Sequence, residues 1–193
     1  MKKERLEAFT DGVVAIIITI MVLELKAPHS ADIKDLLPVL PVFLGYVLSF
    51  IYVGIYWNNH HHMLYLVDSV TGSALWANLA LLFWLSLIPF VTEWMGENHF
   101  AKWPVIIYGI VLLLTALSYT VLYLILARHC GKNSELAKAI GKDWKSRASV
   151  CIYMIAIIAS FYDARIGLML YALVAIIWFI PDRRIEKKVI HQK

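Results

Sequence analysis

The stretch that decides the fold of this chain is RLEAFTDGVVAIIITIMVLELK, residues 5–26. Residues 12–23 within it are apolar apart from Thr19. A run of about 20 mostly apolar residues is long enough to cross the hydrocarbon core of a bilayer. Charged residues nevertheless stand near both ends, Arg5 and Asp11 at the first and Glu24 at the second. The charged ends and the isoleucine-rich middle of this first predicted membrane helix both need an explanation.

The chain as a whole has the composition of an integral membrane protein. Of its 193 residues, 61% are hydrophobic and 17% are charged, whereas a typical soluble domain has about 45–50% and about 25%. We predict an all-α membrane protein with one six-helix transmembrane domain over residues 1–193. Its spans lie at about residues 6–25, 36–58, 73–95, 104–128, 148–162 and 167–181. The last two meet at the polar turn DARIG, residues 163–167.

The distribution of basic residues predicts the orientation in the membrane. With six spans, fourteen of the eighteen lysines and arginines lie on the side that holds both termini. Because basic residues concentrate in cytoplasmic loops, we expect both termini in the cytoplasm and the chain in the cell membrane. The same asymmetry accounts for the net charge of +4, so the expected partner is membrane lipid and not nucleic acid.

A short surface helix is predicted between the fourth and fifth spans. Asn133 or Ser134 would cap it, and Gly141 would end it. Two roles stay open for this segment: contact with anionic lipid or a neighbouring subunit, and a plain solvated linker.

One face of the first helix collects several of its large apolar side chains. At 100° per residue, a narrow face with Thr19 at its border brings together Phe9, Gly12, Ile16, Ile20 and Leu23. Such a stripe either packs against lipid and neighbouring helices or lines a pore, where isoleucines form a hydrophobic constriction that gates by dewetting. The helical pattern alone leaves both readings open.

Polar side chains cluster at the inner end of the second span, in YWNNHHHM, residues 56–63. Adjacent histidines on a helix point about 100° apart, whereas two metal ligands on one helix face need a spacing of three or four. We therefore favour a hydrogen-bonded cluster over a metal site and expect one histidine to reach Asp11 or Arg5. Because histidine titrates near neutral pH, proton sensitivity also stays open.

The third span contains two residues with structural consequences. Asn78 should find a hydrogen-bond partner, because an unpaired amide is costly inside a membrane. Pro89 should kink this span or mark its end, since proline removes a helical hydrogen bond.

The sequence lacks the motifs of the common enzyme and channel classes. It holds no Walker loop or dinucleotide-binding glycine pattern, no nucleophile elbow or zincin pair, and no TVGYG potassium filter. Cys130 and Cys151 form no metal or redox motif. We predict that the chain is not an enzyme and has no cofactor and no resident metal.

Four stretches resemble the bacterial members of the transmembrane protein 175 family, relatives of the lysosomal potassium channel. Arg5-x-x-x-Phe9-Thr10-Asp11 is similar to the family signature Arg-x-x-x-Phe-Ser-Asp, with Thr10 in place of the serine. The other three stretches are SFIYVGIYWNNHHHM at residues 49–63, NLALLFWLSLIPF at residues 78–90 and WFIPDRRIE at residues 178–186.

The resemblance implies a potassium-permeable cation channel without a carbonyl filter. One six-helix repeat per chain would assemble as a homotetramer around a pore lined by the first helix. Carried over by position, the resemblance places the constriction at Ile16, further rings at Ile20 and Leu23, and a polar layer linked to selectivity at Thr19. Potassium would be the permeant ion. The signature residues that would anchor the pore helix are Arg5, Phe9, Thr10, Asp11, Trp57, Asn59, His60 and His61.

Three alternatives to a passive channel are considered. The first is a secondary carrier or proton-conducting pathway that uses Asp11 and the histidines of the second span. Carriers usually show inverted repeats or broken helices near the midplane, and neither is visible in this sequence. The second is a membrane enzyme or metal protein built on residues 60–62, and the third is a structural membrane subunit.

In the channel hypothesis, Glu24 attracts cations at the outer mouth.

Overall fold

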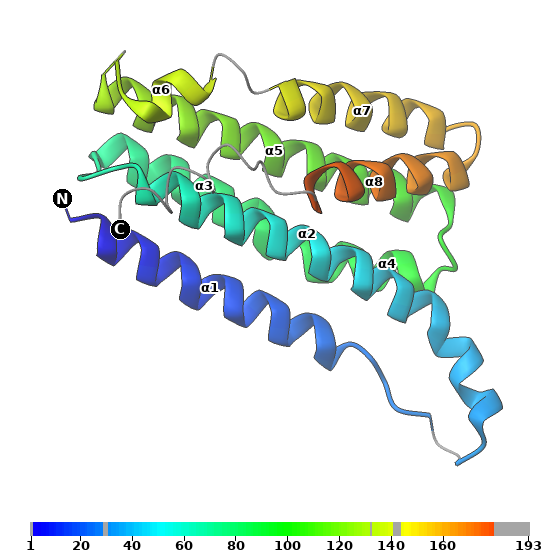
Figure 1. Ribbon diagram of the computed structural model, residues 1–193. Coiled ribbons are helices and arrows are strands. Elements are labelled where there is room, and N and C mark those ends of the chain that lie inside the picture. The colour runs from blue at the N-terminus through cyan, green and yellow to red at the C-terminus, as the bar shows by residue number, and fades with distance from the viewer. Residues whose placement is uncertain (1, 29–30, 132, 141–143, 180–193) are drawn as a thin grey trace.

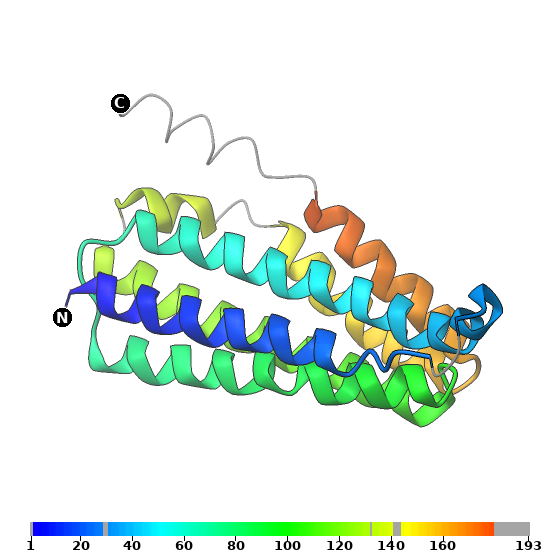
Figure 2. The ribbon, with the colours of Figure 1, turned by 90° about the horizontal axis from the view of Figure 1, so that it is seen from below.

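The computed structural model describes residues 2–28, 31–131, 133–140 and 144–179. Within these ranges the chain forms helices and no β-strand. The helices are α1 (Lys3–Leu23), η1 (Ile33–Val39), α2 (Leu40–Tyr65), α3 (Gly72–Ser86), α4 (Ile88–Glu97), α5 (Lys102–Cys130), α6 (Glu135–Ile140), α7 (Trp144–Ser160) and α8 (Ala164–Phe179). The longer helices run alongside one another, and α1 lies along one edge of the bundle (Figure 1). Seen from below, the outward side of α1 is uncovered (Figure 2).

Four helical stretches among the described residues are long and apolar enough to cross a bilayer. They are Lys3–Leu23, Ile33–Tyr65, Gly72–Glu97 and Lys102–Cys130. They correspond to the first four predicted spans, although the first of them ends two residues before the predicted end at residue 25. The predicted fifth and sixth spans fall on α7 and α8, which have only 17 and 16 residues. Residues 180 and 181 of the predicted sixth span lie outside the described residues. The chain is therefore an all-helical membrane protein in which four stretches qualify as spans by length.

The third of these stretches is broken near Pro89. α3 ends at Ser86 and α4 begins at Ile88, with Leu87 between them. Pro89 falls in the first turn of α4, where its missing N–H group and its ring are tolerated. In a continuous helix the same ring would clash with the carbonyl group four residues earlier. This is the break that the sequence predicts.

α2 continues as a helix past residue 58, where its span was expected to end, to Tyr65. Its 26 residues span about 39 Å at about 1.5 Å per residue, more than the ~30 Å of the hydrocarbon core. The polar residues of the histidine block therefore belong to the helix and lie at its end. The hydropathy of the sequence marks only where the apolar residues end, and the helix continues beyond that point to Tyr65.

The predicted surface helix is α6, and Ser134 is its cap. The Ser134 hydroxyl oxygen accepts a hydrogen bond from the backbone N–H of Ala137 at 3.1 Å, as an N-cap does. Gly141, its predicted end, lies outside the described residues.

The close approach of α2 and α4 depends on Gly96. A Cβ atom at this position would lie 2.6 Å from the Cα atom of Val42, and a backbone atom cannot turn aside as a side chain can. The same interface buries a cluster of hydroxyl groups. Ser49 Oγ lies 2.6 Å from Thr92 Oγ1 and 3.0 Å from the Tyr108 hydroxyl oxygen. These bonds join α2, α4 and α5 in the apolar interior.

Replacing Gly96 with alanine is expected to lower the thermal unfolding temperature of the purified protein. The added methyl group forces α2 and α4 apart, which typically costs about 1–3 kcal/mol. Gly54→Ala in the middle of α2 is the matched control, because its Cβ atom would meet nothing within 4 Å. Equal unfolding temperatures for the two variants would contradict the close contact at Gly96.

Candidate pore helix and its anchors

α1 packs against the rest of the subunit with one face only. Its neighbours are α2, α3 and α4, and its buried residues are Leu6, Thr10, Val14, Ile17 and Met21. The predicted stripe lies on the uncovered side, with exposed fractions of 53% for Phe9, 58% for Ile16, 41% for Ile20 and 77% for Leu23. Packing within the described part of the subunit therefore leaves these large apolar side chains largely uncovered.

Thr19 lies exposed beside the stripe. Its hydroxyl group donates a hydrogen bond to the carbonyl oxygen of Ile16, one turn earlier in the same helix, at 2.9 Å. A threonine hydroxyl has a single hydrogen and two acceptor lone pairs. Because the hydrogen is already used, Thr19 presents an acceptor oxygen to whatever faces this side of α1.

A buried amide in α3 joins α1 to α2. Asn78 Nδ2 donates to the hydroxyl oxygen of Thr10 at 2.9 Å, and Asn78 Oδ1 lies 2.9 Å from His60 Nε2. All three residues are at most 2% exposed. Since an amide oxygen can only accept, the imidazole donates in this arrangement. Asn78 thus has the partners that its place in an apolar helix requires.

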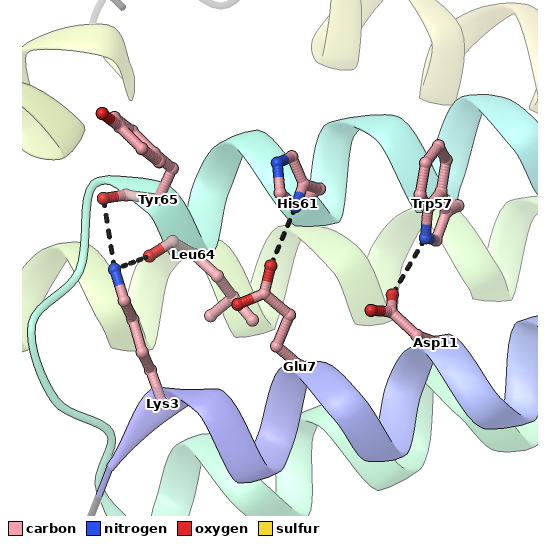
Figure 3. A network of polar contacts seen from close by, with 7 residues as sticks. All are labelled: Lys3, Glu7, Asp11, Trp57, His61, Leu64 and Tyr65. Atoms are coloured by element: carbon pink, nitrogen blue, oxygen red, sulfur yellow. Dashed lines mark hydrogen bonds and ion pairs between the residues drawn. The ribbon is translucent and has the colours of Figure 1, made fainter. Parts of the chain in front are cut away.

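A second set of contacts joins the N-terminal part of α1 to the C-terminal part of α2 (Figure 3). Trp57 Nε1 donates to Asp11 Oδ1 at 2.9 Å, and His61 Nδ1 lies 2.8 Å from Glu7 Oε1. Glu7 and Asp11 are four residues apart on α1, and Trp57 and His61 are four apart on the antiparallel α2. Residues at this spacing share a helix face, so each pair meets one turn from the next.

Lys3 extends this row by one more turn (Figure 3). Its Nζ atom donates to the carbonyl oxygen of Leu64 at 3.0 Å and to that of Tyr65 at 3.4 Å. The last carbonyl groups of a helix have no partner within it. Lys3 adds a donor to two of them at the end of α2, of which Leu64 also accepts from the backbone N–H of Val67.

The predicted anchoring residues thus divide among different partners and do not form one cluster. Asp11 pairs with Trp57 and not with a histidine. The Asn59 side-chain amide donates to the backbone carbonyl oxygen of Ile55 in its own helix at 2.8 Å, and the backbone carbonyl oxygen of Asn59 accepts from the Tyr119 hydroxyl of α5 at 3.2 Å. Arg5 is exposed, and its side chain has no hydrogen bond or ion pair within the described ranges. The cause is helical geometry, which turns consecutive residues of the block toward different neighbours.

Glu7 and Lys3 are anchors that the sequence reasoning missed. Their spacing of four and eight residues from Asp11 places them on the same face of α1. That spacing was a usable signal, but their partners on α2 lie more than fifty residues away.

The histidine block gives no support to a metal protein. Two of its rings are turned to different partners, His60 to Asn78 and His61 to Glu7. In the part of the chain that the structure describes, no group of three His, Cys, Asp or Glu side chains is placed to hold a metal ion.

The C-terminal end of α1 is held by an exposed ion pair. Lys26 Nζ lies 2.9 Å from Glu97 Oε1 and 4.0 Å from Glu93 Oε1. The hydrogen bond to Glu97, with the nearby carboxylate charges, raises the pKa of Lys26 above its ordinary value, so this lysine stays protonated at neutral pH. Glu24, the expected cation attractant, interacts electrostatically with both Lys26 and Glu93. Lys26 therefore offsets part of the negative charge there.

Comparison with known proteins decides the family. The family profile described as "Endosomal/lysosomal potassium channel TMEM175" matches residues 5–89, from α1 to the start of α4. A potassium channel of Chryseobacterium sp. (strain P1-3) is 56% identical over 189 residues, which are 98% of each chain. This chain belongs to the TMEM175 family. Its relatives are ion channels and not enzymes.

Two further TMEM175 proteins show how far the similarity extends. The crystal structure of a lysosomal potassium-selective channel TMEM175 homolog from Chamaesiphon minutus superimposes with a TM-score of 0.81 at 27% identity, covering 92% of this chain and 96% of that one. The mouse protein named as an endosomal/lysosomal proton channel TMEM175 is 32% identical over 116 residues. Those residues make up 54% of this chain and 23% of the mouse protein.

Asn78→Ala is expected to destabilise the protein, because Thr10 and His60 lose their shared partner inside the bundle. Leaving a buried polar group unsatisfied costs about 1–3 kcal/mol, which thermal unfolding of the purified protein would detect. The matched control is Asn98→Ala, because the exposed Asn98 amide at the end of α4 donates to the carbonyl oxygen of Trp94, one turn earlier. An Asn78→Ala protein as stable as the Asn98→Ala protein would show that the buried amide does not hold α1.

Proposed function

We propose that four copies of this TMEM175 chain form a potassium-permeable cation channel, with α1 of each copy lining a central pore. The observation that carries the proposal is the exposed apolar stripe on a helix whose opposite face is fixed to the subunit. A pore needs such a face, uncovered within each subunit. The relative that matches along nearly the whole chain is named a potassium channel, and the number of copies rests on the family resemblance.

The proposed barrier is a ring of four Ile16 side chains, with further rings at Ile20 and Leu23. Apolar side chains offer no oxygen atoms to replace the water around an ion, so the cost of dehydration sets the barrier. A hydrophobic constriction of this kind closes when it loses its water. Flux through it is passive and runs in either direction, down the electrochemical gradient of potassium.

Thr19 would supply the polar layer next to this barrier. Its hydroxyl hydrogen is committed to the Ile16 carbonyl oxygen, so four Thr19 residues present four acceptor oxygens to the pore. Acceptor oxygens stabilise a partly dehydrated cation, and their number and field strength govern the choice between potassium and sodium. Selectivity then rests on side-chain oxygens in place of a carbonyl filter.

In the proposed assembly, six helices of each subunit cross the cell membrane and both termini are cytoplasmic. α7 and α8 complete the six; their 17 and 16 residues span about 25 Å. Local thinning of the bilayer or flanking snorkelling residues accommodate a span of this length. The whole of residues 1–193 then forms one channel domain.

Ile16→Asn is expected to raise potassium flux in reconstituted vesicles and to weaken selectivity, because an amide at the constriction holds water. A fall of about 1.4 kcal/mol in the barrier gives about tenfold more flux. The matched control is Val22→Asn, since Val22 is also exposed on α1, at 45%, but lies about 120° round the helix from Ile16. Similar flux in the two variants and the unchanged protein would exclude Ile16 from the barrier.

Thr19→Val is expected to lower the potassium-to-sodium permeability ratio, because it removes the acceptor oxygen and nearly keeps the shape. Thr19→Ser keeps the oxygen and should stay close to the unchanged protein. Reversal potentials under a potassium/sodium gradient measure both ratios. If serine and valine lower the ratio equally, the oxygen of residue 19 is not what selects potassium.

A proton pathway is the second candidate, because the mouse relative is named a proton channel and the Glu7–His61 pair lies at the inner end of α1. It predicts a current that follows a proton gradient in potassium-free solution and that His61→Gln reduces. A current that vanishes without potassium or another metal cation would favour the potassium channel alone.

A further inference from the structure

A crevice opens between α2, α5, α7 and α8, away from the pore helix. It encloses about 400 Å³, counting its open mouth. Its walls are mainly aromatic, with the rings of Tyr52, Tyr56, Tyr153 and Trp178 among them. Polar groups come from Asn59 near the end of α2 and from Ser146 and Ser149 in the first turns of α7. The crevice therefore has an aromatic wall and a polar inner end.

The Tyr56 hydroxyl group in this crevice lacks a partner. Tyr56 is 9% exposed, and its hydroxyl has no hydrogen bond to any described residue, whereas the Tyr52 hydroxyl donates to the Tyr171 carbonyl oxygen at 2.6 Å. None of the fully buried side-chain polar atoms in the described ranges is unsatisfied, so the Tyr56 hydroxyl must reach the open space. A polar group in such a place normally binds water or a ligand.

The mouth of the crevice lies near the level of lipid headgroups. The outer ends of α5 and of the α7–α8 hairpin are level, since the rings of Trp103 and Phe161 are 5.9 Å apart. From there α5 runs 29 residues, about 44 Å, but α7 and α8 run 17 and 16 residues, only about 25 Å. Figure 1 shows that α7 and α8 are shorter than α5. α7 and α8 therefore end near the inner edge of a ~30 Å hydrocarbon core, and the crevice opens there.

The mouth carries positive charge and tryptophan, the side chains typical of a membrane interface. Lys145 Nζ lies 6.0 Å from the centre of the Trp178 ring, and Arg147 and Trp144 are exposed. Residues 144–149, the start of α7, contain two basic and no acidic side chains. Basic pockets between membrane helices on the cytoplasmic side suit anionic lipid headgroups.

We propose that this crevice binds an anionic phospholipid from the leaflet at the inner ends of α2 and α5. The phosphate contacts Lys145 and Arg147, the Tyr56 hydroxyl donates to an ester carbonyl oxygen, and one acyl chain follows the aromatic wall. A soluble anion would use the charges but leave the wall empty. A neutral phospholipid would fill the wall but gain less from the two cations.

The bound lipid would brace α2 on the side away from the pore helix. Tyr56 and Asn59 line the crevice, and the next residues along α2, Trp57 and His60, hold α1 directly or through Asn78. The site itself does not depend on the channel proposal, because binding is measured without ion flux.

The test is native mass spectrometry of the full-length protein taken from vesicles of phosphatidylcholine with increasing phosphatidylglycerol. We expect phosphatidylglycerol to be retained in preference to phosphatidylcholine, at one molecule per chain.

Lys145→Gln should weaken the apparent affinity for phosphatidylglycerol about tenfold, the effect of losing one charge-assisted contact. Ala116→Leu, which adds bulk to the crevice wall, should abolish retention. Lys102→Gln, at the opposite end of α5, is the matched control and should bind like the unchanged protein.

Three results would overturn the proposal. The first is equal retention of the two lipids, and the second is unchanged retention in Lys145→Gln. The third is displacement of bound phosphatidylglycerol by inorganic phosphate alone, or by palmitate alone, when either is added at the concentration at which phosphatidylglycerol saturates the site. If Ala116→Leu does not fold, Tyr56→Phe takes its place and should weaken retention, since it removes the donor and keeps the ring.

Discussion

The hydrogen bonds of Asn78 are the contacts on which the placement of α1 depends. They fix Thr10 toward the interior, against α3 and His60 of α2, and so they fix the rotation of α1 about its own axis. At 100° per residue, Ile16 then points about 120° away from Thr10, and within the described part of the subunit its side chain is more than half exposed. Asn78 uses its donor for Thr10 and its acceptor for His60. Any other rotation of α1 about its axis would break the bond to Thr10 inside an apolar bundle.

The two ends of α1 are held with unequal strength. At the N-terminal end, the buried amide is reinforced by the pairs that Glu7 and Asp11 make with α2. At the C-terminal end, the Lys26–Glu97 pair is exposed, and exposed ion pairs add little to stability. The stripe from Ile16 to Leu23 therefore belongs to the part of the helix beyond its firm anchors. In the proposed channel, this division suits a barrier that opens through small shifts of the C-terminal half of α1 about a fixed N-terminal end.

The sequence was sufficient to predict the features of this fold that depend on local periodicity. The stripe of α1, the break near Pro89 and the surface helix capped by Ser134 all follow from spacing along one segment. The end of α2 at Tyr65 did not follow, because a helix continues beyond the hydrocarbon core once neighbouring helices satisfy its polar side chains. The partners of Glu7, Asp11 and Asn59 did not follow either. Each contact joins helices far apart in the chain, and only their packing decides which histidine meets which carboxylate.

The central claim is that the exposed face of α1 borders an aqueous pore and not lipid. The most direct measurement is current block by a charged, thiol-reactive methanethiosulfonate in a protein whose Cys130 and Cys151 are changed to serine. We expect the reagent to block the potassium current of a Thr19→Cys protein and to leave that of an Ile158→Cys protein unchanged, since Ile158 is exposed on α7. Full current through Thr19→Cys after the same treatment would contradict the claim, because a thiol that faces lipid does not react with a charged reagent.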